Sequence, residues 1–407
     1  MNSDVILETV FPASMSEAAE VVADAAREGH AVYFRGAGTH FEYGGPPGRA
    51  GIAIATGAMQ EVADYSYRDL TITVGCGVSL NRLGEVLSQQ SQFLPVDCVF
   101  GSDGTIGGAV AWSPPGPRAY RWGTLRDYVL GVRAVDGMGR TFFAGGKVVK
   151  NAAGYNVTRL LTGSWGTLAL ILELTLMVRP LPERLRLLSW VVTKRDRLER
   201  LLGCLIASRS EPSAIEVLGG PRWEKDRFLR VGDHQDEWRV VAVYEGSAGE
   251  VDALCDELRR ELSETGLKIE EELPASSYAP LSNFLADVAR SSCVYELSVR
   301  PTRLAAALDQ LRNLRPRTSF LGHAGLGRIF AFADEDGDVT PELMVRLRGA
   351  IATLGGRVTV LRYPWDSSWN RTAIWGPGGT ASRYMQGLKD QFDPHNILNP
   401  GRYVFPP

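Results

Sequence analysis

The sequence has few cysteines and pairs none of them in a metal-binding motif. Its five cysteines are scattered through 407 residues, and no C-x-x-C spacing occurs among Cys76, Cys98, Cys204, Cys255 and Cys293. An odd, dispersed set of thiols argues against zinc or iron–sulfur ligation within this chain. It is also typical of a reducing compartment. We therefore expect a cytoplasmic protein without a metal site, which partners could bring to a membrane.

Long apolar runs and a dominant charge of one sign are also missing. No apolar run approaches the roughly 20 residues that a membrane helix needs. The N-terminal MNSDVILETVF lacks the positive region and apolar stretch of a signal peptide. The formal net charge of −3 shows no basic bias toward nucleic acid. The composition, 44% hydrophobic and 22% charged, is that of a globular protein, and the length predicts two domains.

Glycine is plentiful, and its first cluster follows a predicted strand at 31–34. The stretch YFRGAGTHFEYGG places Gly36 and Gly38 directly after the apolar residues and Arg35. A dinucleotide fingerprint of the Rossmann type would need a third glycine where Phe41 stands, and a helix where GGPPG follows. The Rossmann interpretation therefore fails. No G-x-x-x-x-G-K-[ST] occurs, which excludes a P-loop.

Two further glycine-rich stretches lie within the first 180 or so residues. They are SDGTIGGAVAW, from Ser102, and KNAAGYNVTRLLTGSWGTLALILELTL, from Lys150. Glycine lets backbone N–H groups approach a phosphate closely. Three such stretches beside strand-like segments indicate a large phosphate-bearing cofactor lying across the backbone.

The second half of the chain begins after the proline-containing VRPLPERL, at 178–185. Its apolar pattern predicts strands and helices in the order β-α-β-β-α-β, which then recurs. The predicted helices cover 197–207, 250–262, 302–311 and 342–354. Two such ferredoxin-like units side by side would form one broad antiparallel sheet backed by helices.

The motifs taken in order resemble a known family. R-G-x-G-T, P-x-D…G-T-x-G-G, R-W-G-x-x-R-D and K-N-x-A-G-Y…G-S-x-G-T-L resemble the vanillyl-alcohol-oxidase-type (PCMH-type) FAD-binding domain. FDPHNILNPGR, at 392–402, resembles the C-terminal signature of FAD-linked oxidases, and KNAAGYNVTRLLTGSWGTL is similar to the smaller FAD-binding subunits of bacterial glycolate oxidases. The resemblance implies an α+β protein with a two-lobed FAD-binding domain over 1–180 and a cap domain over 181–390. The cap would contain ferredoxin-like units at about 186–272 and 293–363, and the tail at 391–407 would return to the FAD domain.

The resemblance also implies which residues bind FAD, mostly through their backbone. Some relatives attach flavin covalently through a histidine, but His40 lies one place beyond that position, so we expect noncovalent FAD with His40 near phosphate. The expected cofactor-binding residues are Arg35, Gly36, Ala37, Gly38, Thr39, His40, Pro95, Thr105, Ile106, Gly107, Gly108, Ser113, Trp122, Gly123, Leu168, Ile171 and Asn399.

The segment GHAGLGRIF, at 322–330, departs from its relatives. Those that oxidise D-2-hydroxy acids carry H-A-G-D-G-N-L-H here, whereas this chain has Leu326, Arg328 and Phe330 in place of the acidic, amide and second histidine positions. Leucine and phenylalanine supply no metal donor. His323 could still act alone as a general base, with Arg328 or Arg371 pairing with a substrate carboxylate.

Three functions remain open at this stage. The leading hypothesis is an FAD-binding subunit of a glycolate (2-hydroxy acid) oxidase or dehydrogenase complex, which oxidises glycolate to glyoxylate or relays electrons. Its partners would be a larger FAD-binding subunit and an iron–sulfur subunit, and the altered segment at 322–330 favours such an accessory role. The alternatives are a self-sufficient FAD-dependent oxidoreductase for a 2-hydroxy acid or alcohol, and a scaffold subunit that has lost its cofactor.

Overall fold

The chain folds into two compact units. The computed structural model describes residues 5–97, 101, 103–147, 155–232, 237–289, 291–333, 339–366 and 368–404. The first unit comprises Met1–Pro114, Thr124–Pro180 and Gly378–Pro407, and the second comprises Pro115–Gly123 and Leu181–Pro377. This division differs from the expected one at 115–123 and at 378–390.

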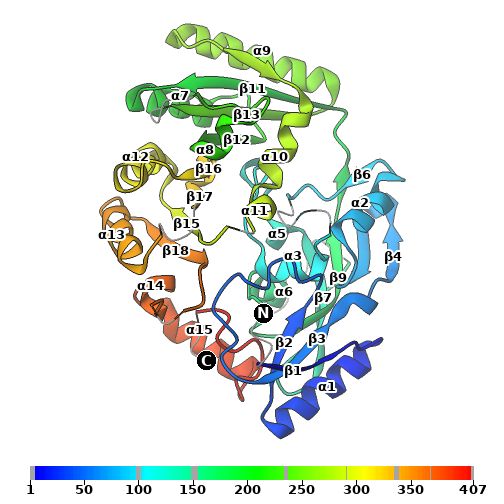
Figure 1. The fold of residues 1–407 in the computed structure, drawn as a ribbon. Coiled ribbons are helices and arrows are strands. Elements are labelled where there is room, and N and C mark those ends of the chain that lie inside the picture. The colour runs from blue at the N-terminus through cyan, green and yellow to red at the C-terminus, as the bar shows by residue number, and fades with distance from the viewer. Residues whose placement is uncertain are drawn as a thin grey trace. The chain divides into compact units, whose positions relative to one another are not determined.

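A three-stranded parallel sheet begins the first unit (Figure 1). Its strands, in the order β1-β3-β2, are Ile6–Val10, Gly51–Ala55 and Ala31–Arg35. Helix α1 (Met15–Glu28) joins β1 to β2 and is capped at both ends. Ser14 Oγ accepts from the Glu17 N–H at 3.2 Å, and Gly29 ends the helix in a left-handed conformation, φ 74°.

A five-stranded antiparallel sheet forms the other lobe of the first unit. Its order is β4-β5-β9-β7-β8, with bounds Val62–Ser66, Thr71–Gly75, Leu170–Met177, Val129–Val135 and Thr141–Gly145. A two-stranded pair joins β6 (Gln92–Phe93) to β10 (Arg179–Pro180). The helices of this unit are α1, α2 (Leu80–Ser88), α3 (Ile106–Trp112), α5 (Leu125–Tyr128), α6 (Val157–Leu161) and α15 (Ala381–Phe392).

Helix α3 forms within the glycine-rich stretch SDGTIGGAVAW. Two glycines in IGGAVAW lower its intrinsic helix propensity. The Thr105 side chain compensates by accepting from the Gly108 N–H at 3.2 Å, and Ile106, Ala109 and Val110 bury one face of the helix. Capping and burial thus outweigh propensity here.

The second unit is built on one eight-stranded antiparallel sheet, in the order β14-β11-β13-β12-β16-β17-β15-β18. Each half contains four strands and two helices in the order β-α-β-β-α-β, as predicted, and β12 pairs with β16 to join the halves. The first half consists of β11 (Arg184–Val192), α7 (Arg195–Ala207), β12 (Ala214–Gly219), β13 (Trp238–Gly246), α9 (Ala248–Thr265) and β14 (Glu271–Leu273). The second half consists of β15 (Val294–Ser298), α12 (Leu304–Leu314), β16 (Ser319–His323), β17 (Arg328–Phe332), α13 (Pro341–Ala352) and β18 (Arg357–Arg362). The short helices of the unit are α4 (Ala119–Trp122), α8 (Pro221–Glu224), α10 (Tyr278–Ser282), α11 (Phe284–Asp287) and α14 (Arg371–Trp375).

The two faces of this sheet differ in chemistry. Alternate residues of each strand, such as Trp238, Val240 and Ala242 of β13, pack with α7, α9, α12 and α13 in one apolar core. The intervening positions face the other way, and among them are buried charged residues such as Glu216 and His323. The sheet face opposite α7, α9, α12 and α13 therefore carries buried charged residues of the second unit.

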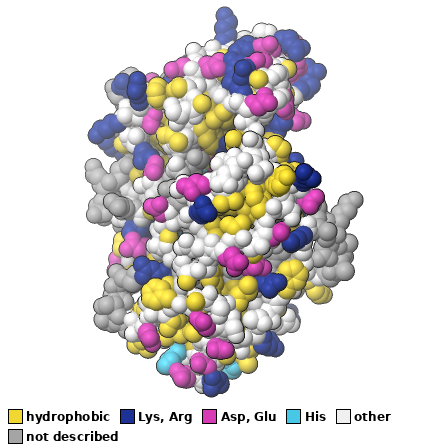
Figure 2. Space-filling model, turned by 90° about the vertical axis from the view of Figure 1, so that its right-hand side faces the viewer, with side chains coloured by type: hydrophobic (Ala, Val, Ile, Leu, Met, Phe, Trp, Pro, Cys, Tyr) yellow, Lys and Arg dark blue, Asp and Glu magenta, His cyan; other side chains and the backbone are white. Residues whose placement is uncertain are grey.

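The protein surface is mixed in charge. On the face shown in Figure 2, Lys and Arg side chains are interspersed with Asp and Glu. Across the described ranges, no helix combines the length and the hydropathy required to cross a bilayer.

Candidate functional site

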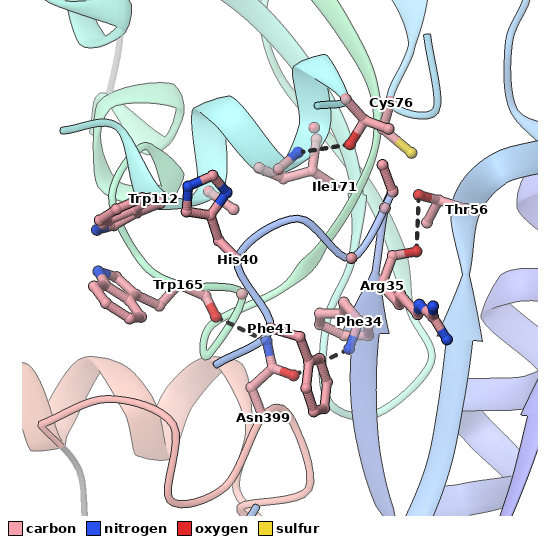
Figure 3. A pocket seen from close by; sticks show the side chains of 18 of the residues that line it. Phe34, Arg35, His40, Phe41, Thr56, Cys76, Trp112, Trp165, Ile171 and Asn399 are labelled. Carbon is pink, nitrogen blue, oxygen red and sulfur yellow. Dashed lines mark hydrogen bonds between the residues drawn. The ribbon is translucent and has the colours of Figure 1, made fainter. Parts of the chain in front are cut away.

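The first unit holds an open cleft, and its empty space of about 1040 Å³ is continuous with solvent. Four segments distant in sequence line it: the end of β2 with its loop, α3 with the residue before it, the loop entering β9, and the C-terminal tail. Figure 3 shows the β2 loop running across the cleft from Arg35 to His40, with α3 on one side. The cleft thus forms where the glycine-rich stretches meet.

Glycine is required in the β2 loop by close packing. A Cβ added to Gly36 would collide with the Thr105 side chain, and Gly38 has a φ of +76°, which L side chains rarely adopt. The Arg35 carbonyl at the start of the loop accepts from Thr56 Oγ1 at 3.5 Å. This packing presents the loop backbone to the cleft.

The wall formed by α3 is equally close-packed. The Gly107 N–H donates to the Cys76 carbonyl at 2.9 Å, and a Cβ on Gly107 would lie 2.7 Å from Cys76 Cβ. Burial raises the pKa of the Cys76 thiol to about 12, so Cys76 stays protonated and serves as packing.

Aromatic rings form a third wall (Figure 3). His40 lies 4.9 Å from the Tyr43 ring centroid and 5.0 Å from that of Trp112, which in turn lies 5.7 Å from Trp165. Burial lowers the pKa of His40 to about 4, so the imidazole is neutral near pH 7. His40 therefore enters the site as a neutral ring in an aromatic cluster.

The C-terminal tail closes the remaining side. Asn399 Oδ1 accepts from the Phe34 N–H at 3.0 Å, and its Nδ2 donates to the Trp165 carbonyl at 2.8 Å. Arg402 donates to the carbonyls of Gly45 at 2.6 Å and Tyr43 at 2.8 Å. The tail thus ties the β2 loop to the loop that enters β9.

The chemistry of the cleft fits a dinucleotide such as FAD. Of the described residues that line it, the charged ones are Arg35 and Arg402, and none is a carboxylate. Cationic side chains, exposed loop amides and a neutral histidine suit an anionic pyrophosphate, while Trp112, Trp165, Leu170 and other apolar side chains suit flat rings. The close contacts at Gly36 and Gly107 explain why these loops lack side chains.

The structure brings most of the expected cofactor-binding residues together. Those lining the cleft are Arg35, Gly36, Ala37, Gly38, Thr39, His40, Thr105, Gly107, Gly108, Ile171 and Asn399. Pro95, Ile106, Ser113 and Leu168 belong to the first unit but do not line the cleft. Trp122 and Gly123 fold with the second unit, where Trp122 Nε1 donates to Glu245 Oε1 at 2.6 Å. Cys98 and residues 150–154 of the K-N-x-A-G-Y motif lie outside the described residues.

Several lining residues were not identified from the sequence: Phe34, Tyr43, Thr56, Cys76, Trp112, Trp165 and Arg402. Arg402 ends the FDPHNILNPGR signature, Trp165 lies within G-S-x-G-T-L, and Trp112 follows the glycines of α3. These three residues therefore stood in or beside the quoted motifs, although the motifs did not single them out.

Two of the three expected catalytic residues meet in the second unit. His323 on β16 lies opposite Arg328 on β17, and His323 Nδ1 lies 2.7 Å from Glu216 Oε2 on β12. His323 is 3% exposed and Glu216 1%. Arg328 pairs with Glu296, and burial lowers the pKa of Arg328 to about 10. Both predicted residues are therefore already engaged with a carboxylate.

Arg371 does not join them. It is the exposed first residue of α14, which contacts α13 and β18 and contributes Ala373 and Ile374 to the core on the helix-covered face. His323 and Arg328 lie on the opposite face. In the described parts of the chain, no group of three or more His, Cys, Asp or Glu side chains could hold a metal.

Comparisons with known proteins agree with this cleft. Residues 7–145 match a family model described as an FAD binding domain. Glycolate oxidase subunit GlcD of Bacillus subtilis (strain 168) is 26% identical over 400 residues, covering 90% of this chain and 82% of that protein. Glycolate oxidase subunit GlcE of Escherichia coli (strain K12) is 38% identical over 122 residues, covering 30% of this chain and 35% of that protein.

The fold has a solved counterpart. The structure of an alkyldihydroxyacetonephosphate synthase superposes with a TM-score of 0.66 at 18% identity, covering 96% of this chain and 76% of that one. At this identity the likeness concerns the fold alone. Together with the matched FAD-binding domain and the named oxidases, it supports the α+β architecture expected from the sequence. The chain thus contains an FAD-binding domain and is an oxidoreductase whose cofactor is FAD, similar to these FAD-linked oxidases.

Proposed function

We propose that this chain is an FAD-binding subunit of a complex that oxidises a 2-hydroxy acid, with glycolate as the first candidate substrate. The observation that carries the proposal is the contrast between the two units. The cleft of the first unit is lined by glycine loops and two arginines, whereas at 322–330 the second unit retains one histidine and replaces three polar positions of related oxidases. The similarity to two glycolate oxidase subunits supports the substrate class.

The cofactor loops have a defined task in this proposal. FAD, when bound, supplies a two-electron acceptor. Residues Gly36–His40 would hold its pyrophosphate through backbone N–H groups, with Arg35 and Arg402 balancing the charge. Residues Thr105–Gly108 would form the close-packed wall beside it, because the N–H groups of Ile106, Gly107 and Gly108 already donate within the protein. We expect the FAD to be noncovalent, because His40 is held in the aromatic cluster with Tyr43 and Trp112.

The remaining partners follow from what the chain does not supply. Its scattered cysteines offer no iron–sulfur motif, so a relay of this kind would reside in a separate subunit. A larger FAD-binding subunit would carry the full set of polar residues that this chain has exchanged for Leu326, Arg328 and Phe330. This chain would then share electrons with that subunit or stabilise it.

One observation favours a second candidate, a self-sufficient 2-hydroxy acid oxidoreductase. The buried carboxylate of Glu216 meets His323 Nδ1, and such a contact fixes a histidine tautomer with Nε2 free to accept a proton. Arg328, next to His323, could meet a substrate carboxylate. In this alternative the second unit of the chain would supply both the base and the anion site.

Turnover by the purified chain separates the two. The holoprotein is mixed with glycolate, D-lactate or L-lactate and an artificial electron acceptor, and flavin bleaching is followed. We expect no bleaching by the chain alone, and turnover when a larger FAD-binding subunit is added. Rapid bleaching of the chain alone, abolished by His323→Gln but not by the control Arg371→Gln, would contradict the subunit proposal and establish the alternative.

A further inference from the structure

A buried ion pair lies behind the cleft, at the start of the C-terminal tail. Lys389 Nζ donates to Asp393 Oδ2 at 2.5 Å, and each residue is 1% exposed. The same ammonium donates to the Thr167 carbonyl at 2.8 Å and the Leu398 carbonyl at 3.1 Å. We call Lys389 and Asp393 the tail hub.

The carboxylate of the hub organises the tail itself. Asp393 Oδ1 accepts from the Ile397 N–H at 2.9 Å, and Oδ2 accepts from the Leu398 N–H at 2.7 Å. A Cβ on Gly137 would collide with the Asp393 side chain, so the β7–β8 turn packs directly against the hub. Residues 393–398 are thereby folded into one fixed turn around the carboxylate.

From this turn the tail passes directly into the cleft. The Val32 N–H donates to the Ile397 carbonyl at 2.7 Å, and the Asn399 N–H donates to the Val32 carbonyl at 2.8 Å, which adds the tail to the edge of β2. Asn399 then bridges Phe34 and Trp165, as Figure 3 shows. Its side-chain amide is occupied at both ends, so Asn399 acts by holding the loops in place.

An ion pair with both members buried is a costly way to pack a helix against a sheet. Apolar residues of similar volume often serve stability equally well, because two charges must lose their water. Here the pair also takes up two carbonyls and two N–H groups of the tail and the Thr167 loop. Beyond stability, the ion pair therefore fixes the position of the tail relative to the loops of the cleft.

We propose that Lys389 and Asp393 are positioning residues for the FAD site. They hold the tail so that Asn399 and Arg402 fix the β2 loop and the Trp165 loop before the cofactor arrives. Neither hub residue lines the cleft. The inference rests on FAD binding and not on the identity of the substrate, so its test does not depend on turnover.

Coupling of this kind is reciprocal. If the docked tail favours FAD, then FAD must favour the docked tail by the same factor. Hydrogen exchange of the wild-type protein tests this without any mutation. We expect FAD to slow exchange at the Leu398 and Asn399 amides, and unchanged exchange would overturn the proposal.

The matched variants are Asp393→Asn and Asp390→Asn. Each variant removes one carboxylate, Asp390 within α15 and Asp393 directly after it. Asp390 differs from Asp393 in being exposed, and it accepts a hydrogen bond from Gln386 Nε2 at 2.8 Å. Titration of apoprotein with FAD should show Kd raised about 5- to 150-fold for Asp393→Asn. For Asp390→Asn we expect a change of less than about twofold. Equal affinities for the two variants would refute the positioning role.

A third variant covers the case in which Asp393→Asn does not fold. The double variant Lys389→Met, Asp393→Leu removes both buried charges, and we expect its folding to stay largely intact. Its apolar side chains supply no acceptor for the N–H groups of the tail. We expect a folded protein, by near-UV circular dichroism, with weakened FAD binding and fast exchange at Leu398. Wild-type FAD affinity in this folded variant would show that the hub contributes only to stability.

Discussion

Substitution of Gly36 by alanine tests whether the cleft binds FAD through the close approach of its loops. An ideal Cβ on Gly36 would lie 2.2 Å from Thr105 Oγ1, 3.2 Å from Thr105 Cγ2 and 3.3 Å from Thr105 Cβ. Ordinary contacts are about 3.5–4 Å, so the β2 loop and Thr105 must move apart by more than 1 Å or so. Overpacking of this kind costs about 1–3 kcal/mol, which corresponds to a roughly 5- to 150-fold loss of FAD affinity if the displaced loop is the binding element.

The assay is an FAD titration of apoprotein, combined with thermal unfolding. Gly84→Ala is the matched control, because nothing lies within 4 Å of a Cβ there and the residue sits inside α2. It should leave FAD affinity unchanged and stabilise the protein by about 0.5–1 kcal/mol. Thr105→Ala removes the two atoms nearest to the added Cβ, Oγ1 and Cγ2, but it also removes the cap of α3, which costs about 1 kcal/mol of stability. The double variant of Gly36 and Thr105 should therefore lose less affinity than the two single variants combined. Strict additivity, or normal binding by Gly36→Ala, would refute the argument.

Three further predictions concern charge. The pKa of His40 is about 4 in the folded protein and about 6.5 in the unfolded chain, so the stability owed to neutral His40 is complete above pH 6.5 and falls by about 3 kcal/mol as the pH drops through 4. Denaturant unfolding of the apoprotein at several pH values should show this loss of stability, and the His40→Gln variant should not show it. Arg402→Lys keeps the charge but loses the fork that reaches several carbonyls, so FAD affinity should fall roughly tenfold in the same titration. Glu245→Gln removes the carboxylate that lies 2.9 Å from the Arg118 guanidinium and weakens the hydrogen bond from Trp122, so the second unit should lose about 3 kcal/mol of stability. Urea unfolding measures this loss, and an unchanged unfolding midpoint would contradict the prediction.

The sequence predicts the second unit well because local signals and tertiary packing agree there. Alternating strands and amphipathic helices recur in the same order, and each helix buries the face that its pattern predicts, as with Leu198, Leu201 and Leu205 of α7. In the first unit, α3 escaped prediction because its glycines are placed for close packing and not for helix propensity. The position of Trp122 was also not predictable, since its partner Glu245 lies more than a hundred residues away.

The cleft illustrates the same limit for a site. Glycines that a phosphate-binding loop requires are visible in the sequence, because few other residues tolerate the backbone at Gly38 or the contacts at Gly36 and Gly107. Arg402 was missed, since its role depends on carbonyls some 360 residues earlier in the chain that only the fold brings near. Local constraints can be recognised from sequence, whereas long-range hydrogen bonds cannot.

The altered segment at 322–330 places His323, Arg328 and Phe330 on the sheet face opposite α7, α9, α12 and α13. Glu216, Glu245 and Glu296 all lie on this face, each buried and each joined to a basic side chain, His323, Arg118 or Arg328. Phe330, which replaces a second histidine, places its ring 5.5 Å from His323 at an interplanar angle of 69°. An apolar ring there excludes water from one side of the imidazole, whose Nδ1 contacts the Glu216 carboxylate. A charged histidine without a partner would be unfavourable in such apolar surroundings. The replacement of polar residues at 326–330 is therefore consistent with the presence of Glu216, which gives His323 a partner. The arrangement retains the histidine as part of a buried pair, which agrees better with a subunit that carries FAD than with one that alone binds and deprotonates a hydroxy acid.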